Sequence, residues 1–117
     1  MTLAYAIILT LMMASPAAAH AIIEFDHAQP AVGSTVDAND AHYLAIWFRA
    51  QFERDEIEIR LRNGQGVVPL VALHEDGPTW EIIARVPNML PPGIYFVDWR
   101  EIDEGELWHT YHFIVTK

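Results

Sequence analysis

Apolar and polar residues alternate along most of the sequence from residue 20 onward. Between residues 56 and 62 the alternation is strict, so Ile57, Ile59 and Leu61 share one face of a strand and charged residues share the other. Further alternating or apolar runs predict strands over residues 21–26, 43–48, 67–73, 79–86, 94–102 and 107–116. Pro69 lies inside one of these runs and predicts that it forms a sheet edge, because proline has no N–H to donate.

Turn-forming residues separate these runs at short intervals. The segment 63–66, Asn-Gly-Gln-Gly, is typical of a hairpin turn because glycine accepts the positive φ that such turns need. No window shows helical periodicity. The arrangement predicts an all-β fold, an immunoglobulin-like antiparallel β-sandwich with Greek-key connections and about seven strands. The spacing alone also allows a small barrel.

The first nineteen residues follow a different pattern. They contain no charged side chain, have an apolar centre and end in Ala17-Ala18-Ala19. The apolar run is too short to span a bilayer comfortably, and small residues at these positions are typical of a signal peptidase site. We therefore predict a signal peptide over residues 1–19 and a mature domain over residues 20–117 that begins with His20. A membrane anchor or a buried N-terminal helix is the alternative.

Charge and cysteine content narrow the function. The mature region carries all 16 acidic and all 7 basic residues, which gives a formal net charge of −9. This sign disfavours nucleic acid and anionic membrane surfaces as partners and suits a soluble carrier of a metal cation. The absence of cysteine excludes thiolate metal sites and thiol redox chemistry. We expect an exported domain that binds no nucleic acid and does not insert into a membrane after cleavage.

A histidine at a free N-terminus is a chelator. The α-amine and imidazole Nδ1 of His20 can bind one metal together, and a further imidazole with a carboxylate or water would complete the tetragonal N,O set that Cu(II) prefers. The amine must lose its proton to bind, and its ordinary pKa near ~8 allows copper to displace that proton close to neutral pH. Alternatively, His20 is only the first residue of a frayed terminus.

Several segments resemble the CopC-type copper-resistance family. Members typically begin with histidine, and a Pro-x-x-Gly-Ser/Ala turn follows, as in residues 26–36 here, Asp-His-Ala-Gln-Pro-Ala-Val-Gly-Ser-Thr-Val. Residues 90–100 are similar to the family stretch Leu-Pro-x-Gly-x-Tyr-x-Val-x-Trp-Arg, residues 44–48 to its second strand, and 111–115 to its last strand. The resemblance implies a non-enzymatic periplasmic sandwich that carries or buffers copper, with an inner-membrane copper transporter as the candidate delivery partner.

The resemblance also implies a Cu(II) site made by the N-terminal histidine and an Asp-x-His pair after Trp-Arg. His20 matches the first position and Asp103 can take the place of the aspartate, but Gly105 stands where the family has histidine. Pleat parity places His109 on the inward side near Trp99, where it is either a ligand or a core histidine.

His27 could instead fold back toward His20, although a solvated surface position is favoured for it, as it is for His42, His74 and His112. We expect one Cu(II) per chain, held by His20 and Asp103 with His109 or His27.

Two further inferences concern the metal and the function class. Met89 is the only methionine after residue 19, so the soft thioether cluster that Cu(I) selects cannot form. The main alternative function is an interaction module of the same fold that has lost its metal site. A copper monooxygenase is disfavoured because the chain is too short for a broad substrate platform, and we expect no enzyme activity.

The four tryptophans, Trp47, Trp80, Trp99 and Trp108, are interpreted as core and rim packing.

Overall fold

The computed structural model describes residues 23–73, 77–105 and 107–117, without the side chain of Glu104. The predicted signal peptide, His20 and His74 lie outside the described residues.

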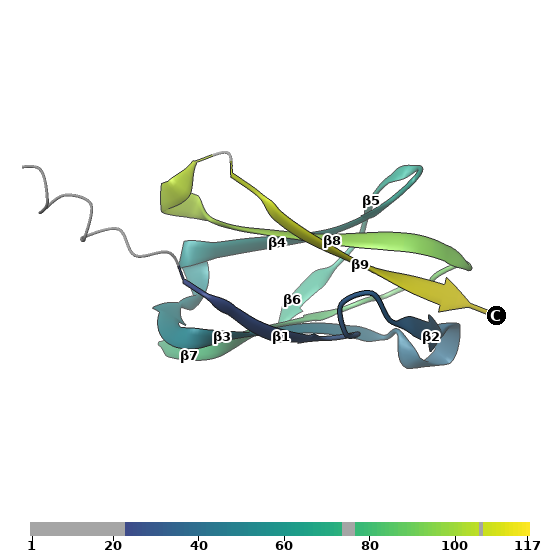
Figure 1. Cartoon of the computed structure of the whole chain (residues 1–117), viewed down its shortest axis with the longest axis horizontal. Helices are drawn as coiled ribbons and strands as arrows, with labels where there is room; N and C mark the ends of the chain where they lie inside the picture. The colour runs from purple at the N-terminus through teal and green to yellow at the C-terminus, as the bar shows by residue number, and fades with distance from the viewer. Residues whose placement is uncertain (1–22, 74–76, 106) are drawn as a thin grey trace, which may run out of the picture.

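In the described part of the chain, two β-sheets pack face to face (Figure 1). The first sheet has the order β1 (Phe25–Gln29), β3 (Tyr43–Glu53), β7 (Pro78–Arg85) and β6 (Val71–Leu73). The second has the order β2 (Thr35–Asp37), β9 (His109–Thr116), β8 (Gly93–Glu101), β4 (Ile57–Asn63) and β5 (Gly66–Val68). The predicted all-β sandwich is confirmed.

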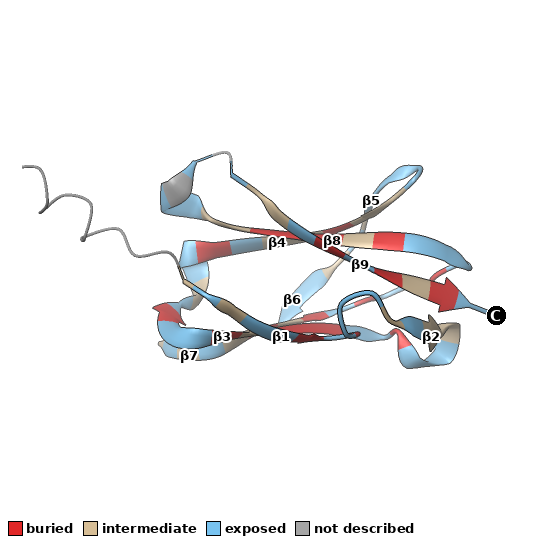
Figure 2. Ribbon diagram, in the orientation of Figure 1, coloured by how far each residue is buried: buried red, intermediate tan, exposed pale blue. Residues whose placement is uncertain are grey.

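The core lies between the two sheets (Figure 2). Alternation is most regular in β9, where Tyr111, Phe113 and Val115 are buried and the residues between them are not. Phe48 of β3 and Trp99 of β8 meet edge to face across the layers, with ring centroids 4.9 Å apart. Tyr95 and Phe113 stack within the second sheet at 5.7 Å. The hydroxyl of Tyr95 donates to the carbonyl of Pro91, four residues upstream, at 2.6 Å. This bond resembles the tyrosine corner of immunoglobulin-like sandwiches.

The predicted run 67–73 is two short strands in different sheets. β5 ends at Val68 and β6 begins at Val71, so Pro69 lies where the chain crosses from one sheet to the other. Both strands occupy sheet edges, which confirms the edge position that Pro69 predicts. The physical reason for the break is the same, because proline has no N–H with which to continue a ladder.

Other differences from the prediction concern strand ends and pairing. β3 continues past Phe48 to Glu53 through an irregularity in its pairing with β7, which returns Phe52 to the core. β2 is an additional strand that pairs parallel with β9, so the sandwich is not wholly antiparallel. Trp80 is 51% exposed, so its interpretation as core or rim packing is wrong. Three 3-10 turns complete the described elements: η1 (Ala38–Asp40), η2 (Arg54–Glu56) and η3 (Ile102–Glu104).

The start of β1 and the η3 turn lie at the same end of the sandwich, and the C-terminus lies at the other end (Figure 1). In the part of the chain that the structure describes, no helix has the length and apolar character needed to cross a membrane.

Candidate metal centre

The β8–β9 hairpin brings His109 next to Trp99. The two residues are register partners, and their rings stack with centroids 4.2 Å apart and planes inclined by 20°. His109 has the same pleat parity as Tyr111, Phe113 and Val115, which are all buried. The inward orientation predicted for His109 is therefore confirmed. Its imidazole lies half-buried near the turn that closes the hairpin.

Residues on either side of His109 hold it in this orientation. The guanidinium carbons of Arg60 and Arg100 lie 4.0 and 4.5 Å from ring centroids of Trp108, which precedes His109. On the other side, the hydroxyl of Thr110 donates to Oδ1 of Asp98 at 2.6 Å. Since successive side chains of a strand point to opposite faces, anchoring both neighbours on the outer face turns His109 inward.

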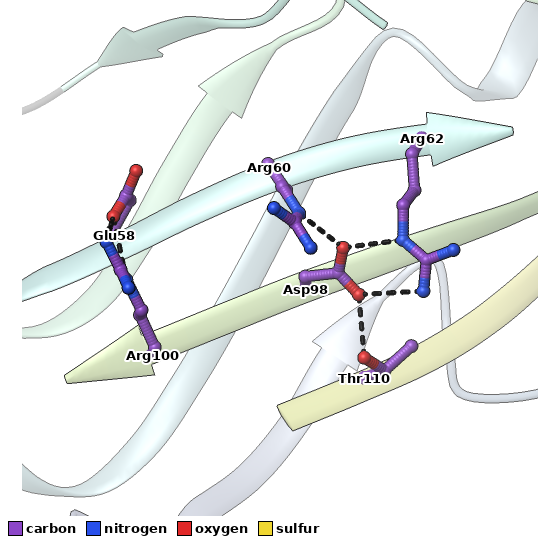
Figure 3. Close-up of polar contacts among 6 residues, drawn as sticks. All are labelled: Glu58, Arg60, Arg62, Asp98, Arg100 and Thr110. Atoms are coloured by element: carbon purple, nitrogen blue, oxygen red, sulfur yellow. Dashed lines mark hydrogen bonds and ion pairs between the residues drawn. The ribbon is translucent and has the colours of Figure 1, made fainter. Parts of the chain in front are cut away.

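Asp98 is the centre of a polar cluster on that outer face (Figure 3). Its carboxylate is fully buried and accepts from Nε of Arg60 at 2.6 Å and from Nε of Arg62 at 2.7 Å. Arg62 adds a second bond from Nη2 to Oδ1 at 3.2 Å. Burial alone would raise the pKa of Asp98, but the bonds from Arg62, Thr110 and Arg60 outweigh it and hold the pKa below its usual range. The cluster ties β4, β8 and β9 together directly behind the Trp99–His109 pair.

Asp103 lies in the η3 turn at the tip of the hairpin, where it is exposed. Arg100 of β8 links this turn to β4. Its Nη1 donates to the carbonyl of Gly105 at 3.0 Å, and its Nη2 lies 2.8 Å from the Glu58 carboxylate. Gly105 ends the turn with φ at 75°, a conformation that glycine adopts without strain. The position of Asp103 is thus fixed by the backbone of a supported turn.

The N-terminal segment reaches the same tip. The N–H of Arg49 donates to the carbonyl of Glu24 at 2.9 Å, which places the segment on the first sheet. The N–H of Ile23 donates to Oε2 of Glu101 at 3.3 Å, although Glu101 ends a strand of the second sheet. Sequence reasoning missed both Glu101 and the supporting role of Arg100. The available signal was the pair of charged residues after Trp99, but only the fold shows that the N-terminal segment passes beside them.

His27 lies elsewhere. Its ring stacks on Trp47 with centroids 4.4 Å apart and planes inclined by 8°, and its Nδ1 is 3.0 Å from Oδ2 of Asp26. Both rings lie on the solvent side of the first sheet, since Ile46 and Phe48 on either side of Trp47 are buried. The structure therefore does not bring His27 beside His109.

The other two described histidines, His42 and His112, are exposed, as predicted. Among the described side chains, no three potential metal ligands gather in one group. His20 lies outside the described residues. The described part of the candidate centre is therefore Asp103 and His109, with Ile23 and Glu101 marking the path of the N-terminal segment.

Comparison with known proteins identifies the fold. No protein-family model and no curated protein matches the sequence. The chain is similar to the solved structure of PcoC, a methionine-rich copper resistance protein from Escherichia coli, with a TM-score of 0.67 and 20% identity over 82% of this chain and 100% of PcoC. It is also similar to CopC from Methylosinus trichosporium OB3b, with a TM-score of 0.66 and 22% identity over 80% of this chain and 93% of that one. The structural match to CopC and PcoC thus extends over most of the chain.

Proposed function

From a fold shared with CopC and PcoC, we propose that this chain is a periplasmic Cu(II)-binding protein for copper carriage, buffering or resistance. Removal of residues 1–19 exposes the amine of His20, which binds one Cu(II) together with its imidazole. Asp103 supplies an oxygen and His109 supplies the third nitrogen. This donor set has the nitrogen-rich tetragonal character that Cu(II) prefers.

The contact between Ile23 and Glu101 carries this proposal. It shows that the N-terminal segment meets the β8–β9 hairpin two residues before Asp103 and two residues after Trp99. Three residues of chain span at most about 11 Å when fully extended. A terminus three residues before Ile23 is therefore within reach of the hairpin tip that carries Asp103 and His109.

The structure favours His109 over His27 as the third nitrogen. His109 belongs to the hairpin that the N-terminal segment contacts, and its neighbours anchor it in one orientation. His27 already uses Nδ1 on Asp26 and stacks flat on Trp47 on the solvent side of the other sheet. To serve as a ligand beside His109, it would have to leave both contacts.

Methionine content argues for the Cu(II) state. PcoC is described as methionine-rich. Within residues 20–117 this chain has one methionine, Met89, and its side chain is exposed. Cu(I) selects soft thioether and thiolate donors, which this chain cannot assemble around one ion. We expect one Cu(II) per chain and no high-affinity Cu(I) site.

Titration of the processed chain, residues 20–117, with Cu(II) tests the proposal. We expect one tight equivalent, and a form with one extra N-terminal residue should bind far more weakly because its amine is displaced. His109→Ala should weaken binding on the order of tenfold or more and change the nitrogen hyperfine pattern in electron paramagnetic resonance. Asp103→Asn should weaken Cu(II) binding less than His109→Ala does. His27→Ala is the matched control and should leave affinity and spectrum unchanged.

Three outcomes would contradict the proposal. Equal binding by the processed and extended forms would remove His20 from the site. Loss of binding in His27→Ala with no change in His109→Ala would move the third nitrogen to the first strand. No stoichiometric binding by the processed chain would leave the interaction module as the better interpretation.

A further inference from the structure

Glu101 connects two parts of the molecule that the sheets leave separate. β1 belongs to the first sheet, where it pairs with β3, and the Arg49 N–H continues that pairing back to Glu24. Glu101 is the last residue of β8 in the second sheet. Its Oε2 accepts the N–H of Ile23 at 3.3 Å in a partly buried contact between residues 78 positions apart.

The position of Glu101 in the hairpin gives this contact a functional meaning. Trp99, two residues before it, stacks on His109, and Asp103 follows two residues after it in η3. Arg100 fixes the turn through Gly105. The end of β8 therefore carries Glu101, which contacts the N-terminal segment. Within two residues of Glu101 lie Trp99, which stacks on the ligand candidate His109, and Asp103, the other described ligand candidate.

We propose that Glu101 is a positioning residue for the metal centre, which holds the N-terminal segment so that the terminal donors meet Asp103 and His109. This inference rests on the proposed function. A carboxylate that accepts a backbone N–H makes a charge-assisted hydrogen bond, stronger than a neutral one. Holding the segment in place before copper arrives removes ordering entropy from the binding step, which raises affinity without adding a ligand. Glu101 acts through Ile23 in this proposal and does not itself touch the metal.

Two substitutions separate positioning from ligation. Glu101→Gln retains a side-chain oxygen at the same reach that can accept the Ile23 N–H, but it removes the negative charge. Glu101→Ala removes the acceptor altogether. We expect Glu101→Gln to bind Cu(II) within about threefold of the wild type and Glu101→Ala to bind about tenfold or more weakly, the range typical of residues that orient ligands. Glu24→Ala is the control, because it removes one exposed carboxylate beside Ile23 without touching the contact.

A second measurement needs no metal. Amide hydrogen exchange of Ile23, followed by nuclear magnetic resonance on copper-free protein, should be about fivefold faster in Glu101→Ala than in the wild type, as for the loss of one net hydrogen bond. Glu101→Gln and Glu24→Ala should exchange at nearly the wild-type rate.

The outcomes distinguish this inference from the proposed function. If Glu101→Gln loses as much affinity as Glu101→Ala, the carboxylate acts by charge or by ligation and positioning is wrong. If Glu101→Ala matches the wild type in affinity and exchange, the contact has no role. If the wild type binds no Cu(II), the proposed function and the role of Glu101 toward copper both fail, while the exchange rates still show whether Glu101 holds the segment.

Discussion

Replacing Asp98 by asparagine tests how much the polar cluster on the outer face of the β8–β9 hairpin stabilises the fold. The carboxylate is buried and accepts four hydrogen bonds, from Arg60, Arg62 twice and Thr110. Asparagine has nearly the same shape but no charge, and its amide end donates where the carboxylate accepts. The substitution leaves two guanidinium groups without their counter-ion.

The size of the effect follows from the exposure of the partners. Removing one member of a buried ion pair typically costs about 3 to 5 kcal/mol. Here the side chains of Arg60 and Arg62 are 38% and 37% exposed, so water can solvate part of the charge that is left. We therefore expect Asp98→Asn to lower the free energy of unfolding by about 2 to 3 kcal/mol, below the fully buried range. In a domain of this size that loss lowers Tm by roughly 10 °C or more.

The effect should depend on pH in a defined direction. The bonds to Asp98 hold its folded-state pKa below the ordinary aspartate value of about 3.9. A group with a lowered folded-state pKa stabilises the fold above its unfolded-state pKa, and this contribution is lost as pH falls through the folded-state pKa. The stability difference between wild type and Asp98→Asn should therefore be constant above about pH 5 and shrink below about pH 4.

Urea denaturation followed by tryptophan fluorescence, repeated from pH 7 to pH 3, measures this difference. Glu58→Gln is the matched control, because it removes a carboxylate paired with Arg100 on the same sheet face. Its side chain is 46% exposed, so the loss should stay below about 1 kcal/mol. An Asp98→Asn protein as stable as Glu58→Gln, or a gap that does not shrink in acid, would refute the reasoning.

Two further predictions concern processing and the core. The intact mass of protein recovered from a bacterial periplasm should correspond to residues 20–117, because residues 17–19 form the only well-formed cleavage site. Recovery of the full chain in the membrane fraction would contradict cleavage, and it would also contradict the proposed copper site, which needs the free amine of His20. Tyr111→Phe should leave the free energy of unfolding in urea unchanged or raise it by about 1 kcal/mol. Burial raises the pKa of this tyrosine, and its hydroxyl has no hydrogen-bond partner among the described residues. A loss of stability would instead reveal a partner for the hydroxyl.

The alternating strands were predictable because one face of each lies in the core. Period-two patterning around residues 94–102 and 107–116 locates β8 and β9 within two residues at each end, and it gives the inward orientation of His109. β2 could not be predicted, since three residues are too few to show a period. The continuation of β3 was hidden because Arg49, Ala50 and Gln51 are all exposed before Phe52 returns to the core.

The residues of the candidate site also differ in whether the sequence alone could predict them. Asp103 was suggested by the resemblance to the CopC-type family, and His109 by pleat parity within the same hairpin. The roles of Glu101 and Asp98 depend on residues far away in sequence, Ile23 for one and Arg60 with Arg62 for the other. Such contacts are set by which strands become neighbours, and the sequence pattern does not determine this for a sandwich.

The contact between Ile23 and Glu101 has a consequence for how the molecule resists unfolding. It joins an edge of one sheet to a strand end of the other in a chain that has no cysteine and therefore no disulfide. Under the proposed function, a Cu(II) ion bound both by His20 and by the β8–β9 hairpin would link the same two parts of the molecule more strongly. Unlike a disulfide, such an ion would stabilise the fold by binding only the folded chain, in which its donors lie together. If the proposed function holds, the copper-loaded protein should therefore resist heat and proteolysis better than the copper-free protein.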